Sequence, residues 1–214
     1  MEKEKFEFNS EIASSIIHIV GFIFSIVAIS FLVVYSSAEK NAWKIVGFSI
    51  YGFTLIFLFL FSSLYHGINH SEKIKERLRT FDYIGIFLLI AGTFTPVCLT
   101  ILRGIFGWTI FGVIWLLAIL GIIIRSLKVP VWVTSPIYLL MEWLGILVAF
   151  PLFDLSVRAF YYLLAGGIFY TFGLIIFTIQ KPNLSSHLTF HEIWHVFVLL
   201  GAISHFLMMF FYIL

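Results

Sequence analysis

Long apolar segments separated by short polar connections make up most of the chain. Seven such segments lie at about 12–35, 43–66, 81–101, 106–124, 136–153, 157–179 and 190–213. A helix needs about 20 apolar residues to cross a bilayer. Only helices and closed barrels satisfy their backbone polar groups in lipid, and a barrel would show short alternating segments instead. The pattern therefore predicts an all-α fold, a seven-transmembrane helix bundle, in a single integral membrane domain over residues 1–214.

The composition is typical of a membrane protein and argues against a nucleic-acid partner. The 214 residues are 61% hydrophobic and 11% charged, with a mean hydropathy of +1.08. The net charge of +2 gives no basis for a nucleic-acid partner, so membrane lipids are the expected partners. The first apolar segment is too long for a cleavable signal peptide and predicts a retained helix. With Cys98 as the single cysteine, the chain forms no intramolecular disulfide.

Lysine and arginine predict the orientation of the bundle. Nine of them fall on the side of the N-terminus, namely Lys3, Lys5, Lys73, Lys75, Arg77, Arg79, Arg125, Lys128 and Lys181. Four fall on the other side, namely Lys40, Lys44, Arg103 and Arg158. Because cytoplasmic connections carry the excess of positive residues, we expect a cytoplasmic N-terminus and an outside C-terminus, in the plasma membrane.

Four ionisable residues lie at the ends of these apolar segments. His66 closes the second segment, Asp82 opens the third, and His191 and His195 open the last. With the predicted topology, all four fall within roughly 10 Å of the cytoplasmic surface at the rise of a helix. Ionisable side chains are costly in a bilayer and often mark a functional site.

The spacing of these residues predicts a metal site. His191 and His195 are four residues apart and share one helix face, and His66 can supply a third imidazole. Three protein ligands and an open position are typical of catalytic Zn²⁺. Asp82 can hydrogen-bond a metal-bound water or orient a histidine, and Ser62 lies one turn before His66. Hydrogen-bonded interior histidines without a metal are the structural alternative.

The segment His191-Glu192-Ile193-Trp194-His195 also matches the H-E-x-x-H signature of zinc metalloproteases, in which Glu192 would be the general base. Glu192 has a second possible role, because Thr189-x-x-Glu192 fits a capping box that starts a helix near residue 190. This second role weighs against a protease.

Other polar residues are expected to be mainly structural. Glu11, Ser14, His18 and Ser25 form a stripe on the first helix, facing the interior. Its likelier role is packing, although Glu11 and His18 can reach the predicted site. Glu142 has structural and functional interpretations of equal weight, and His205 is expected to be an interior hydrogen-bonding residue. Ser135-Pro136 predicts the start of the fifth helix.

Three segments carry a resemblance to a known family. They are Ser62-Ser63-Leu64-Tyr65-His66, the run from Phe81-Asp82-Tyr83 to Thr95-Pro96, and the run from His191 to Gly201. In these segments the chain resembles the hemolysin III family, which is related to the progestin and adipoQ receptors and distantly to alkaline ceramidases. The resemblance implies a Zn²⁺ site toward the cytoplasmic side with His66, His191 and His195 as ligands. It also implies catalytic or outer-sphere roles for Asp82 and Ser62.

The sequence leaves three hypotheses for the function. The leading hypothesis is a zinc-dependent membrane hydrolase of lipid amides or esters, with a lipid substrate in the helical cavity. The family name implies cytolysis by a pore or channel-like protein as an alternative. A sensor or regulator of membrane lipid composition, with structural zinc, is the third.

Overall fold

The structure, a computed structural model, describes residues 2–68, 71–185 and 187–214. Within these ranges the chain forms helices and no strand, which confirms the predicted all-α class. The helices are α1 (Glu2–Ala38), α2 (Ala42–Gly67), α3 (Glu72–Leu99), α4 (Ile105–Ser126), α5 (Val131–Trp143), α6 (Ile146–Leu155), α7 (Val157–Ile179) and α8 (Phe190–Met208), and a π-helical turn (Met209–Ile213) continues α8.

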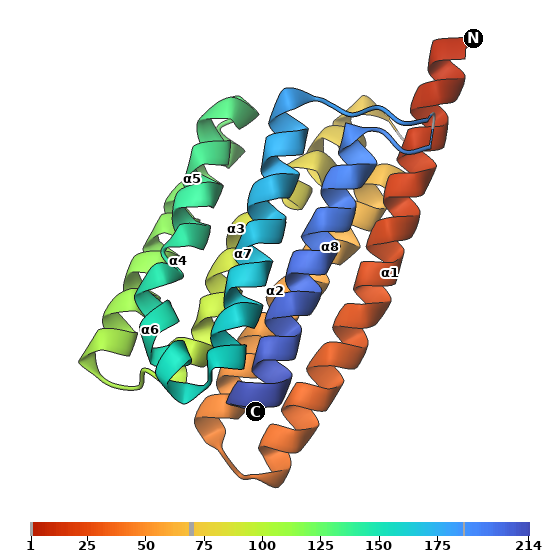
Figure 1. The fold of residues 1–214 in the computed structure, drawn as a ribbon. Helices are drawn as coiled ribbons and strands as arrows, with labels where there is room; N and C mark the ends of the chain where they lie inside the picture. The colour runs from red at the N-terminus through yellow and green to blue at the C-terminus, as the bar shows by residue number, and fades with distance from the viewer. Residues whose placement is uncertain (1, 69–70, 186) are drawn as a thin grey trace.

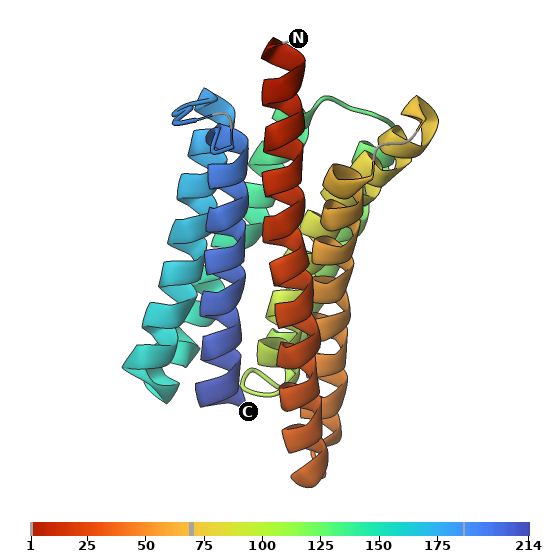
Figure 2. The same ribbon diagram turned by 90° about the vertical axis from the view of Figure 1, so that its right-hand side faces the viewer.

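Seven segments are long and apolar enough to cross a membrane, as the sequence predicts, since α5 and α6 together form one segment, Trp132–Leu155. The helices run side by side as a bundle, and the two termini lie at opposite ends of it (Figures 1 and 2). The last turn of α2 and the first turns of α3 and α8 lie at the end that carries the N-terminus (Figure 1). The polar residues at those helix ends are therefore at similar depth.

Close approach of α2 and α3 fixes the position of the two helices. A Cβ on Gly92 would lie 2.0 Å from Thr54 Oγ1, and a Cβ on Gly85 would lie 2.9 Å from the Leu58 Cα. Small residues allow transmembrane helices to pack backbone to backbone in this way. As a result, α2 and α3 pack closely and together form one wall of the bundle.

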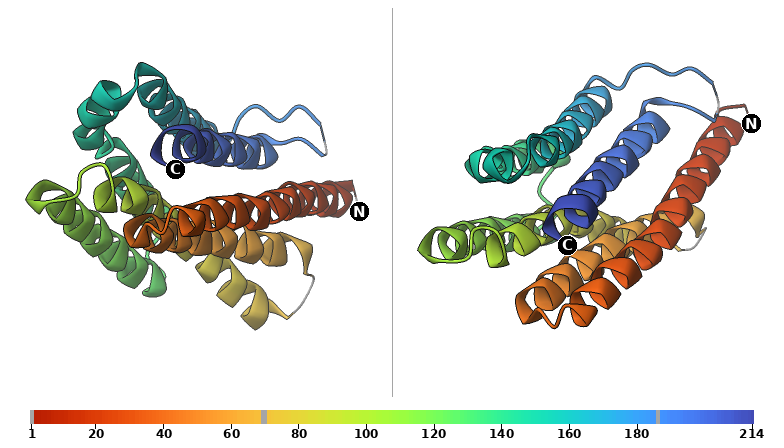
Figure 3. Two further views of the ribbon diagram at one scale, coloured as in Figure 1. Left: turned by 90° about the horizontal axis from the view of Figure 1, so that it is seen from below. Right: turned by 60° about the horizontal axis from the view of Figure 1, so that its bottom comes forward.

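Two further packing surfaces complete the arrangement. α7 packs along α8, and α1 contacts both α2 and α8, so the first and last spans are neighbours (Figures 2 and 3). Side chains such as Phe48, Phe59 and Phe87 are fully buried between the helices. The contact of α1 with α8 matters most for function, because it brings residues from the two ends of the chain together.

Three helix boundaries differ from the sequence predictions. α5 begins at Val131 with Pro130 as its N-cap, so the predicted start at Ser135-Pro136 is wrong. The apolar residues before Pro136 extend the helix by more than a turn, so Pro136 lies inside it, and transmembrane helices tolerate an internal proline. The fifth span is also broken, because α5 ends at Trp143 and α6 begins at Ile146. α3 begins at Glu72, since the polar residues before Phe81 continue the helix.

Candidate metal centre

Three imidazoles from three helices meet at the N-terminal end of the bundle. His18 comes from α1, His66 from the last turn of α2 and His195 from the second turn of α8. One nitrogen from each lies within 4.8 Å of the others. The three side chains are almost fully buried, with exposed fractions of 1%, 6% and 4%. This geometry can hold a metal ion.

His18 and His195 are joined directly. His18 Nε2 lies 2.8 Å from His195 Nδ1, in hydrogen-bonding contact. One of these nitrogens carries the proton, so the bond couples the tautomers of the two rings. The remaining nitrogens, His18 Nδ1 and His195 Nε2, are buried and have no hydrogen-bond partner among the described residues.

His66 is held by a carboxylate from α1. Glu11 Oε2 lies 3.4 Å from His66 Nδ1, and Lys75 Nζ lies 3.1 Å from the same oxygen. Glu11 Oε2 is close to His66 Nδ1 but does not have the geometry of a hydrogen bond. Neither His66 nitrogen has a hydrogen-bond partner among the described residues. A carboxylate beside one imidazole nitrogen orients the ring so that the other nitrogen can bind a metal.

His191 completes a cluster of four histidines. Its ring centroid lies 4.5 Å from that of His195 and 5.2 Å from that of His66. We call His18, His66, His191 and His195 the histidine cluster. The structure brings the three ligands predicted from the sequence into contact and adds His18. Among the described residues, the ligand atoms that converge are those of His18, His66 and His195, so His18 takes the place that the sequence predicts for His191, whose ring lies beside the group.

The two predicted catalytic residues lie next to this cluster. Asp82, near the start of the apolar part of α3, interacts electrostatically with His66 and Ser62. Ser62 is one turn before His66 on α2 and is 1% exposed. Its hydroxyl group interacts with the Asp82 carboxylate. The hydroxyl and carboxylate are thus available beside the imidazoles.

Glu192 has the capping role that the sequence allowed. Its Oε2 accepts hydrogen bonds from the Thr189 backbone N–H, at 2.7 Å, and from the Thr189 hydroxyl, at 2.5 Å. Its Oε1 accepts a bond of 2.9 Å from the Ser14 hydroxyl on α1. The capping box of α8 is complete. Both carboxylate oxygens are therefore engaged in holding the start of α8, which disfavours Glu192 as the base of a protease.

The donor set fits a transition metal. Buried imidazole nitrogens without partners are costly unless something binds them, and imidazole suits Zn²⁺, Cu, Fe and Ni. The residues therefore fit a Zn²⁺ ion, although their chemistry does not select zinc over these other metals.

His18 and Glu11 are the site residues to which the sequence analysis gave only a secondary role. Both were assigned mainly to helix packing, as part of the polar stripe on the first helix. The available signal was their spacing of seven residues, two helical turns, on the half of the helix nearest the predicted site. The sequence does not show which helices contact this stripe. In the structure, α1 packs against both α2 and α8.

Comparison with known proteins gives one family and close relatives. The family model described as "Haemolysin-III related" matches residues 6–206. A Bacillus cereus protein named "Hemolysin-3" is 41% identical over 209 residues, covering 96% of this chain and 93% of the relative. A Bacillus subtilis (strain 168) protein named "Hemolysin-3 homolog" is 38% identical over 210 residues, covering 97% and 96%.

Proposed function

The chain belongs to the haemolysin-III related family, and we propose that it is a zinc-dependent membrane hydrolase that cleaves an amide or ester bond of a lipid. The observation that supports this most directly is the convergence of the buried imidazoles of His18, His66 and His195, with nitrogens within 4.8 Å of one another. The Asp82 carboxylate and the Ser62 hydroxyl lie beside them and interact with each other. Histidines that only pack in the interior would not need a carboxylate and a hydroxyl group beside them.

His66, His191 and His195 are the proposed ligands, as the resemblance implies. When His195 Nδ1–H donates to His18 Nε2, His195 Nε2 is unprotonated and can bind a metal, and Glu11 faces His66 Nδ1 in the same way. His18 and Glu11 are then positioning residues that orient the ligand rings. When bound, Zn²⁺ supplies a Lewis acid for the carbonyl group and activates a water molecule.

Asp82 and Ser62 carry out the remaining chemistry. The Asp82 carboxylate takes a proton from the attacking water as the oxygen of that water bonds to the carbonyl carbon. It returns the proton to the leaving nitrogen or oxygen as the amide or ester bond breaks, so that an acid and an amine or alcohol result. The Ser62 hydroxyl donates a hydrogen bond to the carbonyl oxygen as negative charge develops there.

The position of the cluster favours a substrate that resides in the membrane. It lies within the ends of transmembrane segments, at the end of the bundle with the N-terminus. The excess of lysine and arginine on that side supports a cytoplasmic location. A lipid of the plasma membrane can then present its head-group linkage at this depth.

Two measurements test the proposal. Purified wild-type protein should contain zinc, and a His191→Ala/His195→Ala variant should not, by elemental analysis. Cells that express the wild-type protein should accumulate a lipid acid, amine or alcohol that cells with the Asp82→Ala variant lack. Equal zinc in both proteins would refute the metal site. Zinc binding with identical lipid profiles would refute the hydrolase and favour a sensor with structural zinc.

Cytolysis is the second candidate, because two relatives carry the name hemolysin. A pore or channel-like protein would release dye from liposomes without a metal. Dye release that persists in chelator and in the Asp82→Ala variant would support this candidate over the hydrolase. Liposomes that remain intact at high protein content would count against it.

A further inference from the structure

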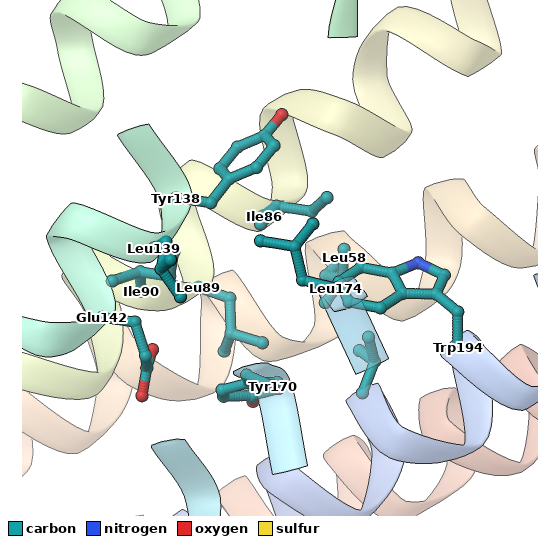
Figure 4. A pocket seen from close by; sticks show the side chains of 11 residues that line it. Leu58, Ile86, Leu89, Ile90, Tyr138, Leu139, Glu142, Tyr170, Leu174 and Trp194 are labelled. Atoms are coloured by element: carbon teal, nitrogen blue, oxygen red, sulfur yellow. The ribbon is translucent and has the colours of Figure 1, made fainter. Parts of the chain in front are cut away.

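Two cavities of the bundle differ in the side chains around them. The interior cavity is lined mainly by aliphatic and aromatic side chains, such as Leu89 and Trp194 (Figure 4). A larger cavity, of about 420 Å³, lies at the end of the bundle opposite the N-terminus (Figure 1). We call it the basic cavity, and its polar lining residues are Asn41, Lys44, Thr100 and Arg103. Its volume falls within the range of small-molecule sites.

Arg103, in the connection between α3 and α4, brings a positive charge to the basic cavity. Its Cζ lies 4.4 Å from the centre of the Trp43 ring, which is typical of cation–π contact. The side chain is exposed, and among the described residues its guanidinium forms no ion pair. A guanidinium offers its N–H groups in a planar fork that matches the oxygens of a phosphate. Stacking on Trp43 orients this fork before an anion arrives.

Lys44 supplies a second positive charge, which is partly balanced. Its ammonium lies 2.6 Å from Glu39 Oε2 and also donates to the Leu214 main-chain oxygen. An ammonium has three donors, so one remains for a further acceptor. Among the described residues, no aspartate or glutamate lines the cavity. The two connections and the first turn of α2 together carry Lys40, Lys44 and Arg103 against Glu39, so positive charge is in excess here.

The residues around the basic cavity place it at the level of lipid head groups. Trp43 and Trp108 lie in the first turns of α2 and α4, with ring centroids 5.9 Å apart. Tryptophan is enriched where transmembrane helices meet the membrane surface. Beside them, Ile105 begins the apolar span of α4 and is 91% exposed. Lipid chains can therefore lie along α4 while a head group lies at Arg103.

We propose that the basic cavity binds the phosphate group of a membrane phospholipid that carries a net negative charge. Arg103 donates two hydrogen bonds to phosphate oxygens, and Lys44 donates a third. Basic pockets at the ends of transmembrane helices bind anionic head groups in this way. A choline group would bring a further positive charge toward Arg103, so zwitterionic phosphatidylcholine binds less well. The histidine cluster lies at the other end of the bundle, and binding here depends neither on a metal nor on the proposed hydrolysis.

Native mass spectrometry of the full-length protein in detergent tests the site. The protein is titrated with ether-linked phosphatidylglycerol, which has no ester bond for the proposed hydrolase, and with ether-linked phosphatidylcholine of the same chains. Phosphatidylglycerol should bind with a Kd about fivefold lower, as one exposed charge pair can contribute. Arg103→Gln should raise the Kd of phosphatidylglycerol by about fivefold or more and so remove the preference between the two lipids.

Two further variants separate this site from general effects of charge. Arg158→Gln removes an exposed arginine from the first turn of α7, at the same end of the bundle (Figure 1), and should keep the wild-type Kd and preference. Trp43→Leu keeps both charges but removes the stacking, and should raise the Kd of phosphatidylglycerol about twofold to fivefold. Melting temperatures establish that each variant is folded.

A soluble competitor distinguishes a lipid from a free phosphate compound. Glycerol 1-phosphate carries the phosphate group without the chains and should not displace phosphatidylglycerol when both are present at equal concentration. Displacement under these conditions would assign the cavity to a soluble anion and overturn the proposal. An unchanged lipid preference in folded Arg103→Gln, or an equal loss in Arg158→Gln, would also overturn it.

Discussion

The histidine cluster and the Glu142 region are both polar and buried, but their polar groups are satisfied in different ways. In the cluster, His18 bonds to His195 and Glu11 faces His66. Nearby, Glu192 uses both oxygens to cap α8 and bind Ser14. In the Glu142 region, Glu142 Oε1 on α5 lies 3.8 Å from His205 Nε2 on α8, beyond hydrogen-bond distance. The first region is thus joined by hydrogen bonds and close contacts across three helices, whereas in the second the carboxyl group and the imidazole face each other at a longer distance.

The largest expected effect is at His66, which belongs to both possible ligand sets. His66→Ala should weaken zinc binding by about a hundredfold or more, since even outer partners of a ligand are worth about 10–100-fold. Zinc titration against a competing chelator measures this. His187→Ala, a change outside the helices, is the matched control and should keep wild-type affinity. If His66→Ala kept the wild-type zinc affinity, the proposed metal centre would be wrong.

Comparison of His18→Ala with His191→Ala decides which histidine is the third ligand. If His191 binds the metal and His18 orients His195, the His191 variant should lose most of its zinc. The His18 variant should lose about 10–100-fold in affinity. The same titration applies to both. The reverse order would place His18 in the coordination sphere instead.

A smaller effect is expected from Glu192→Gln, through stability. The change weakens bonds to Thr189 and Ser14, and losing charged hydrogen bonds in a buried site should cost about 1–3 kcal/mol. Thermal unfolding in detergent measures the cost. Glu72→Gln changes the first-turn glutamate of α3, which is exposed, and should have little effect. Loss of zinc without loss of stability would instead favour the protease-like role.

The smallest effect is expected from Glu142→Leu. Because the contact between Glu142 and His205 is longer than a hydrogen bond, replacing this buried polar group with an apolar one should change the free energy of unfolding by only about 0–1 kcal/mol, or increase it. The same unfolding measurement gives a direct contrast with Glu192→Gln. A loss as large as that in the Glu192 variant would show that Glu142 is satisfied within the fold and that the two regions are alike.

Sequence predicted the features that depend on one helix at a time. Apolar length gave the seven spans, the T-x-x-E pattern gave the cap at Thr189, and topology placed His66 and His195 at one depth. The roles of His18 and Glu11 depend on how α1 is rotated against α2 and α8, which no single segment encodes. The break after Trp143 was missed because Leu144 and Gly145 are also common inside transmembrane helices.

The hydrogen bond between His18 and His195 joins residues 177 positions apart, with a consequence for biogenesis. At a synthesis rate of about 5–20 residues per second, α1 waits on the order of 10 s in the membrane before α8 exists. During that time, Ser14 and His18 lack the partners they have in the finished protein. Completion of the last span therefore closes the bundle and assembles the histidine cluster in one event. A chain truncated before α8 can form neither the closed bundle nor the cluster.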